Sequence, residues 1–390
     1  MKKNIPILLI ISLLLCLVGS PLFAGGGQEE TTAREPVKVG AILAVTGGAS
    51  FLGAPESKTL EMLVEKANAA GGIDGHPVEL IIKDSQASAE KAISFAKQLI
   101  EEERVLAIIG PSTSGESMAI KDLCQEAEMI LLSCAAAETI VDPVAQYVFK
   151  TPQKDSYAAI WIFKTMQQMG ISKIGVVAGN TGFGNGGKAQ LEKYAPEHGI
   201  EIAIAEVYDG AATDLTGVLT KLKAQDVEAV VNWSIVPAQS IIPKNMRQLG
   251  MDVPLFQSHG FGNIKYVEAA GDAGEGIIFP CGRLLVADML PAGHPQKELL
   301  TSYKNEYESR YGEDVSTFGG HAYDAFVLLE AAVEKSGSVE PNAVRDALES
   351  LQGVAGTAGI FNLSASDHNG LGLDSFEMLT VKDGKFVMFE

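Results

Sequence analysis

VKVGAILAV (residues 37–45) begins a run of short apolar segments, and VELIIKD (78–84) and VLAIIG (105–110) follow it along the chain. Amphipathic stretches of helical length at 53–70 and 88–103 separate these segments. β-Branched residues are frequent in the apolar segments, which have the length of strands. Strands that alternate with helices predict β-α-β units, and hence a parallel sheet covered on both faces. The sequence therefore predicts a doubly wound α/β domain.

The alternation starts again after residues 151–156, with strands such as KIGVVAG at 173–179 and VEAVVNWS at 227–234. We therefore expect a second, similar α/β module. Past Pro280 the chain has three helical stretches but no parallel sheet of its own for them to cover, so they should return to the first module. Ligands of open α/β sheets bind beyond the carboxyl ends of the strands, and two facing modules would enclose a cleft there. A DG pair at 383–384 predicts a closing hairpin between the last strands.

The N-terminus has the pattern of a secretory signal peptide, predicted at residues 1–24. Lys2 and Lys3 precede an apolar run at residues 5–18, Gly19 and Pro21 break this run, and a small residue, Ala24, ends the predicted signal peptide. This run is shorter than the roughly 20 residues that span a bilayer. We expect export to the periplasm or another extracytoplasmic site, with no membrane insertion of the mature chain.

Cys16 leaves a second possibility, a lipid anchor, although Leu15 stands where a small residue is preferred before an acylated cysteine. Residues 25–36, which are polar and begin with three glycines, are expected to form a flexible tether.

Composition excludes several classes of protein. The 390 residues are 46% hydrophobic and 20% charged, which is typical of globular domains. The net charge of −19 disfavours nucleic acid and anionic membranes as partners. Beyond the signal peptide, Cys124, Cys134 and Cys281 lack the close spacing of a zinc or redox site. No metal is expected, and whether one pair of these cysteines is oxidised stays open.

Enzyme signatures are missing from the sequence. It has no G-x-S-x-G or H-E-x-x-H motif, and its six histidines are scattered. Gly182, Gly184 and Gly187 match the dinucleotide pattern G-x-G-x-x-G, but the first glycine follows the strand too late for that turn. We expect a glycine-rich cleft loop here, and a protein with no catalytic residues and no cofactor.

Two loops have the composition of an anion site. GPSTSGES at 110–117 follows a strand and opens a helix, and SCAAAET at 133–139 follows the next strand. Hydroxyl groups, the amides of a helix start and small side chains together suit a carboxylate. The alternative is structural: Ser112 or Ser114 caps the helix, and the small residues allow close packing.

Several segments, in this order and spacing, resemble the periplasmic leucine/isoleucine/valine-binding proteins, which are the solute receptors of ABC importers. These segments are VGAILAVTGGAS with Gly53, KANAAGGIDGHPVEL, IIGPSTSG, LLSCAAAET, YVFKTPQKD, SHGFGN, GDAGEG and GGHAYDA. The resemblance implies a type I periplasmic-binding fold with two doubly wound parallel-sheet lobes joined by a three-crossing hinge. Lobe 1 would comprise residues 37–154 plus 283–374, and lobe 2 residues 155–282 plus 375–390. The implied partners are a small carboxylate ligand and an ABC permease in the inner membrane.

The resemblance also implies roles for individual residues. Ser114 falls at the serine that holds the ligand carboxylate, and Ala135 and Ala136 fall where backbone groups contact the ligand. Phe183 falls at an aromatic position of the cleft. Leu52, beside Phe51, stands at an aromatic position over the ligand. Because glycines flank Phe183, we expect it to lie in a loop with little core around it.

Departures from the family pattern leave the ligand's charge open. His259 stands where amino-acid binders carry a glutamate for the ligand ammonium, and Ala137 replaces a threonine that contacts it. Gln86 and Thr113 stand where some relatives have a disulfide. The SHG and VFKTPQ segments resemble a branch that takes aromatic or keto acids.

Two interpretations of His259 remain. In the first, His259 donates a hydrogen bond to an acid or keto oxygen of the ligand. In the second, it caps a helix that begins near Asn263, while Glu116 or Glu138 serves a ligand ammonium. We therefore expect a non-enzymatic receptor for a branched-chain amino acid or an aromatic or keto acid. The alternatives are a sensory ligand-binding protein or, less favoured, an enzyme that uses the same cleft.

Overall fold

The computed structural model describes residues 34–390, so the predicted signal peptide, Cys16 and the tether up to residue 33 lie outside the described residues. The first sheet has five parallel strands in the order β2-β1-β3-β4-β5. Its strands are β1 (Val37–Leu43), β2 (Val78–Asp84), β3 (Ala107–Ile109), β4 (Ile130–Ser133) and β5 (Val148–Lys150).

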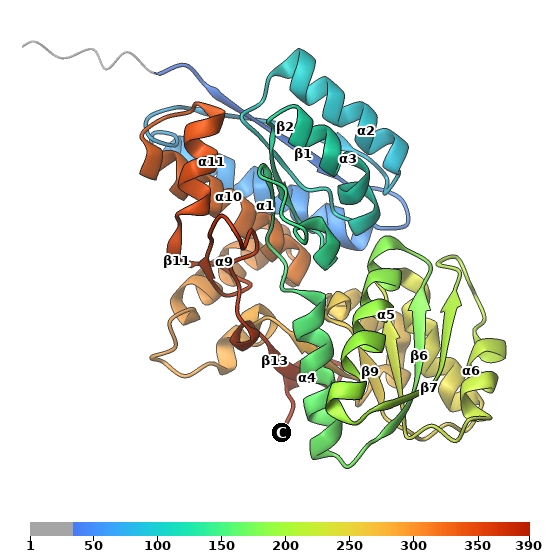
Figure 1. Ribbon diagram of the computed structural model, residues 1–390. Coiled ribbons are helices and arrows are strands. Elements are labelled where there is room, and N and C mark those ends of the chain that lie inside the picture. Colours follow the sequence, from blue (N-terminus) through green and yellow to red (C-terminus); the bar gives the residue numbers. More distant parts are fainter. Residues whose placement is uncertain (1–33) are drawn as a thin grey trace, which may run out of the picture. The chain divides into compact units, whose positions relative to one another are not determined.

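Helices cover both faces of this sheet (Figure 1). They are α1 (Ser50–Ala69), α2 (Ala89–Lys97), α3 (Ser114–Glu126), α10 (Thr317–Ser336) and α11 (Pro341–Glu349), with α9 (Lys297–Tyr311) beyond α10. Along β1, Ala41 and Leu43 pack with α1, α10 and α11, whereas Ile42 packs with α2 and α3. Successive strand residues point to opposite faces, so both faces of a sheet buried on each side need apolar residues. The uninterrupted apolar run of β1 satisfies this requirement.

The second sheet has seven strands in the order β14-β13-β10-β9-β8-β6-β7. Five are parallel, and β13 and β14 add an antiparallel hairpin at one edge. The strands are β6 (Lys173–Gly179), β7 (Glu201–Tyr208), β8 (Ala229–Trp233), β9 (Leu255–Gln257), β10 (Ile278–Cys281), β13 (Glu377–Lys382) and β14 (Lys385–Met388). The accompanying helices are α4 (Asp155–Gln168), α5 (Gly182–Tyr194), α6 (Thr216–Lys223), α7 (Ile242–Gln248) and α8 (Ile264–Ala270).

The chain passes between the two sheets three times: after β5, after β10 and before β13. The helices α10 and α11 pack on the first sheet, which places the second passage ahead of them. Two parallel-sheet bodies joined by three crossings confirm the predicted fold class. We propose that the chain crosses from one body to the other near residues 154, 282 and 374.

Some element boundaries differ from expectation. Helix α1 begins at Ser50 and α5 at Gly182, so TGFGNGG opens a helix and is not a loop. The side chain of Thr181 caps α5 by accepting a hydrogen bond from the amide of Gly184. A side chain at Gly187 would collide with the Trp233 ring, at 2.0 Å from its indole nitrogen. Gly187 therefore allows the close packing of α5 on β8.

The C-terminal strands form two separate pairs. The predicted hairpin at the DG turn is confirmed, because β13 pairs with β14. The other pair is β11 (Gln352–Ala355) with β12 (Ile360–Asn362), which form a small antiparallel sheet of their own. Within residues 34–390, no helix is long and apolar enough to cross a membrane. Cys124, Cys134 and Cys281 are buried thiols without disulfides.

Candidate functional site

The N-terminus of α3 forms the base of the site. Thr113 caps this helix, its hydroxyl accepting from the amide of Glu116 at 3.4 Å. The expected caps, Ser112 and Ser114, have other roles, because the capping position lies between them. Ser114 Oγ accepts from the amide of Ala137 at 3.2 Å, which ties the two predicted loops together.

Ser112 lies beneath this helix start with its hydroxyl fully engaged. Its Oγ accepts a hydrogen bond from the amide of Ala44 at 3.0 Å and donates one to a carboxyl oxygen of Glu56. Both side chains are buried, and the second carboxyl oxygen of Glu56 has no partner among the described residues.

The alanines after β4 have backbone groups that already form hydrogen bonds within the protein. The amide of Ala135 donates to Ser133 Oγ at 3.1 Å. The buried ammonium of Lys150 donates to the carbonyl oxygens of Ala136, Pro152 and Gln153 at 2.8, 2.9 and 3.0 Å. Burial lowers the pKa of Lys150, and nearby Asp155 opposes this shift. A cation therefore lies directly behind this wall.

Phe183 forms the wall contributed by the second sheet. It is the second residue of α5 and only 2% exposed, so the expected loop position with little core is wrong. Its ring centroid lies 5.9 Å from that of Trp233 and 5.2 Å from that of His259. A side chain added at Gly260 would lie 2.8 Å from the Phe183 ring. The helical start of α5 points this aromatic inward because Gly260 leaves room for it.

His259 lies among three aromatic rings, those of Phe183, Trp233 and Phe376. Burial, with contributions from Lys150 and His321, lowers the pKa of His259 well below its usual range, so the imidazole is neutral at pH 7. Neither ring nitrogen has a hydrogen-bond partner among residues 34–390, although Nε2 lies 3.5 Å from Asp155 Oδ1.

His259 does not cap the following helix. Asn263 performs that role, its side-chain oxygen accepting from the amide of Lys265 at 3.0 Å. The two acids considered for an ammonium are also engaged: Glu116 accepts from Thr113 Oγ1 at 2.6 Å, and Glu138 accepts from the amide of Ser156 at 3.1 Å. The helix-cap alternative for His259 is therefore wrong.

These walls enclose an inner chamber of about 20 Å³, lined by thirteen residues. Six of the eight predicted site residues line it: Leu52, Ser114, Ala135, Ala136, Phe183 and His259. Ala137 is held next to it by its bond to Ser114. Phe51 lies elsewhere, with its ring 5.3 Å from that of Tyr266 in an edge-to-face contact.

Ser112 and Cys134, which belong to the two loops predicted as an anion site, also line the chamber. Sequence reasoning missed the other five lining residues: Pro152, Ile235, Gly260, Phe318 and His321. His321 is the most informative of them. Burial lowers its pKa to about 3, so it is neutral, and its Nδ1 has no partner in the described part of the chain. The GGHAYDA segment contained it, but a lone histidine on an apolar helix has no signal of its own.

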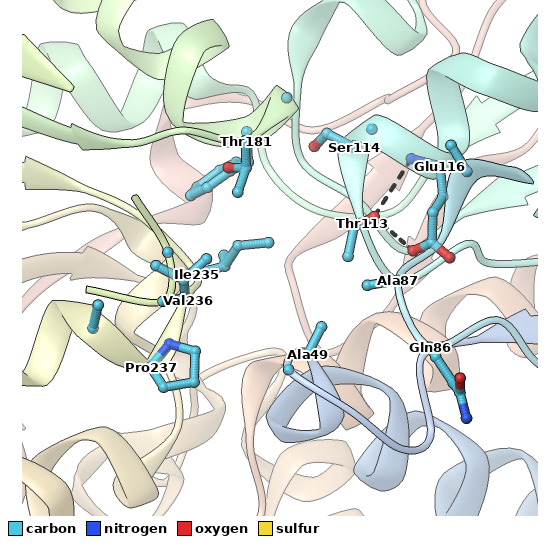
Figure 2. Close-up of a pocket in the computed structure, with 18 of the residues that line it drawn as sticks. Ala49, Gln86, Ala87, Thr113, Ser114, Glu116, Thr181, Ile235, Val236 and Pro237 are labelled. Carbon is cyan, nitrogen blue, oxygen red and sulfur yellow. Dashed lines mark hydrogen bonds between the residues drawn. The ribbon is translucent and has the colours of Figure 1, made fainter. Parts of the chain in front are cut away.

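An outer cleft of about 750 Å³ adjoins the chamber (Figure 2). Thr113, Ser114 and Glu116 line it on one side, and Thr181 and Ile235 face them from the other (Figure 2). The starts of α3 and α5 approach closely here, since a side chain at Gly182 would lie 2.9 Å from the amide nitrogen of Gly115. Ser114, Phe183 and Ile235 line both spaces and form the threshold between them.

Among residues 34–390, no three His, Cys, Asp or Glu side chains gather to hold a metal ion. A family profile described as periplasmic binding protein matches residues 36–385. The chain belongs to the periplasmic binding protein family.

Individual relatives of this periplasmic binding protein agree with the family. A leucine-, isoleucine-, valine-, threonine- and alanine-binding protein of Pseudomonas aeruginosa is 24% identical over 335 residues, which are 84% of this chain and 87% of the relative. The structure of an extracellular ligand-binding receptor from Rhodopseudomonas palustris is 27% identical, with a TM-score of 0.85, covering 91% of this chain and 99% of the receptor.

A branched-chain amino acid transporter substrate-binding protein from Streptococcus pneumoniae, solved in complex with isoleucine, is also similar. It is 25% identical, with a TM-score of 0.79, and the match covers 90% of this chain and 97% of that protein. These similarities extend over nearly the whole of both chains, so the family assignment applies to both sheets.

Proposed function

We propose that this protein is an exported receptor of an ABC importer that captures a small carboxylate between its two sheets and delivers it to a permease. The ligand carboxylate would lie at Ser114, which lines both the chamber and the cleft. The body of the ligand would contact Leu52, Phe183 and Ile235. We assign no catalytic residue and no cofactor to this site.

The observation that carries the proposal is the charge of the chamber walls. None of the thirteen lining residues is an acid, and both lining histidines are neutral. Lys150 places its ammonium on the carbonyl of Ala136 behind the wall. The amides at the start of α3 add partial positive charge. This field stabilises an anion and opposes a cation.

Capture requires the walls to move. At about 20 Å³ the chamber has room for roughly one water molecule, and its walls come from both sheets. A ligand would therefore enter when the sheets part at the three crossings, and closure would exclude water around it. Hydrogen bonds to Ser114 would be strengthened in this dry site, because charges interact more strongly at low dielectric.

The walls favour an acid that lacks an α-ammonium group, such as a keto or aromatic acid. A neutral imidazole has one donor and one acceptor, and His259 has a partner for neither. It can donate to a keto or hydroxyl oxygen, whereas it cannot neutralise an enclosed ammonium.

A branched-chain amino acid is the second candidate, and two observations support it. The relative from Pseudomonas aeruginosa is named for such ligands. In addition, the buried Asp155 carboxyl group lies 3.5 Å from His259 Nε2, and neither of its oxygens has a hydrogen-bond partner in the described chain. Burial raises the pKa of Asp155 well above its usual range, nearby Lys150 opposes this rise, and an enclosed ammonium would oppose it further. An ammonium beside His259 could draw on this carboxylate.

Calorimetric titration distinguishes the two candidates. The ligands are L-leucine, L-phenylalanine, 4-methyl-2-oxopentanoate and phenylpyruvate, tested on the natural protein, His259→Glu and His259→Ala. We expect the keto acids to bind the natural protein more tightly, and His259→Glu to shift preference towards the amino acids. Tight leucine binding that His259→Ala leaves unchanged would refute the keto-acid assignment. Mass spectrometry of the incubated ligands should return each one unchanged, as a receptor requires.

A further inference from the structure

Glu56 is a buried acid attached directly to a wall of the chamber. It lies on α1 with no exposed surface, and its only hydrogen-bonded side-chain partner among residues 34–390 is Ser112, which lines the chamber. Its other oxygen, Oε1, has no partner. A buried ionised carboxylate with one hydrogen bond is strongly disfavoured, so this geometry favours a protonated acid.

The Ser112 hydroxyl has two possible arrangements. When Glu56 is ionised, Ser112 must donate its single proton to the carboxylate, while its oxygen accepts from the Ala44 amide. Ser112 then offers only lone pairs to the chamber, and these repel a carboxylate. When Glu56 is protonated, it can donate to Ser112 Oγ instead. The serine proton is then free to turn towards the chamber.

We propose that Glu56 is a positioning residue that, in its protonated form, makes Ser112 a hydrogen-bond donor to the bound anion, so that ligand capture requires a proton on Glu56. This inference rests on the proposed function of the chamber. It predicts that Ser112, together with Ser114, contacts the ligand carboxylate, and that binding is linked to the uptake of a proton when Glu56 is ionised.

The surroundings of Glu56 favour the protonated form of its side chain at neutral pH. Burial raises the pKa of Glu56 to about 8, the Ser112 hydrogen bond opposes the rise, and Glu116 adds to it. The remaining titratable groups around Glu56 and the chamber come from several elements: Glu116 on α3, Cys134 after β4, His259 after β9, Tyr303 on α9, and His321 and Asp324 on α10. Burial raises the pKa of Cys134 and of Tyr303, so both stay neutral between pH 7 and 9.

Two other acids and one base in this region could also change the pH dependence of binding. Asp324 accepts hydrogen bonds from the amides of Thr357 and Ala358, and is therefore held away from Ser112. Burial raises the pKa of Asp324 to about 7, so its ionisation also contributes to the pH dependence near the chamber. Glu116 is bonded to Thr113. Lys150, whose pKa is lowered by burial, also loses charge in the alkaline range. Its titration would weaken anion binding without involving Glu56, so the test must separate the two.

The test titrates 4-methyl-2-oxopentanoate and phenylpyruvate by calorimetry between pH 7 and pH 9, in buffers of different ionisation enthalpy. If only the protonated form binds, affinity falls roughly tenfold over this range, and proton uptake approaches half a proton per ligand near pH 8. Glu56→Gln keeps a donor to Ser112 and should lose the pH dependence and the proton uptake that Glu56 contributes, so that only the smaller contributions of Lys150 and Asp324 are left. Ser112→Ala should bind more weakly at pH 7, with the same loss of pH dependence.

Glu330→Gln is the matched control. Glu330 lies on α10 outside the chamber, and burial also raises its pKa, so its replacement should leave the pH dependence of the natural protein intact. A wild-type pH profile in Glu56→Gln would overturn the inference and assign the effect to Lys150 or Asp324.

A ligand-free measurement keeps the two proposals distinguishable. The infrared carbonyl band of a protonated carboxylic acid should be present at pH 7 in the natural protein, and Glu56→Gln should lack this contribution. Failure of every carboxylate to bind would refute the proposed function, whereas identical infrared spectra of the two proteins would refute the protonation of Glu56.

Discussion

Phe183→Ala should weaken both folding and ligand binding. The side chain is 2% exposed and packs against Trp233 and His259, so it belongs to the core of the second sheet. It also lines the chamber and the outer cleft, so it belongs to the proposed binding site. This double role contradicts the expectation from sequence that Phe183 lies in a loop with little core around it.

The size of each effect follows from these contacts. Truncating a buried phenylalanine to alanine costs about 3–5 kcal/mol of stability. The melting temperature should fall by about 6–10 °C, at roughly 2 °C per kcal/mol for a domain of this size. Aromatic contacts contribute about 0.5–1.5 kcal/mol beyond area burial, so the affinity for a keto or aromatic acid should fall by roughly tenfold.

Differential scanning calorimetry gives the first quantity and isothermal titration with phenylpyruvate the second, both below the melting temperature of the variant. Phe163→Ala provides a matched control, because Phe163 on α4 is fully buried in the same core cluster but does not line the chamber. It should lose similar stability and keep the natural affinity. Natural affinity in Phe183→Ala would refute its place in the site, and natural stability would refute its place in the core.

Three further predictions concern single residues. Ser114→Ala should weaken carboxylate binding by about 1–3 kcal/mol, measured by calorimetry, and unchanged affinity would contradict this expectation. The same change should lower the free energy of unfolding in urea by roughly 1–3 kcal/mol, because the buried amide of Ala137 loses its acceptor. Gly187→Ala should lower the melting temperature, because its side chain would collide with Trp233, and an unchanged value would show that α5 can shift. Glu56→Gln should be more stable than the natural protein in urea at pH 8 but not at pH 4.

The pH dependence of Glu56→Gln follows from the sign of the pKa shift. The pKa of Glu56 is raised by burial from its ordinary 4.5 to about 8 in the folded protein, so the unfolded chain loses this proton first. The contribution of Glu56 to the free energy of unfolding is therefore fully present below about pH 4.5. Between about pH 4.5 and about pH 8 this free energy falls by about 1.4 kcal/mol per pH unit, and the contribution is lost once the pH has passed about 8. A stability gap between the two proteins that stays constant with pH would contradict a raised pKa.

The sequence by itself determined the α/β alternation, because apolar periodicity is local and each strand or helix carries its own pattern. It also located the two loops around Ser114 and Ala135, since glycine, hydroxyl and small residues at strand ends mark such loops. The order of family motifs extended this to two bodies with three crossings. The first residues of the helices did not follow from the sequence. TGFGNGG has the composition of a loop, but in the structure Thr181 caps α5 and Gly187 packs against Trp233, so the segment is helical.

Only the tertiary structure decided which distant residues meet at the site. Phe183 is buried because Gly260 leaves space for its ring, and His321 joins His259 because α10 returns to the first sheet. Glu56 belongs to an amphipathic helix by pattern, yet packing buries its side chain completely against Ser112. Burial and hydrogen-bond partners set the charge of such groups, and both depend on contacts between segments far apart in the chain.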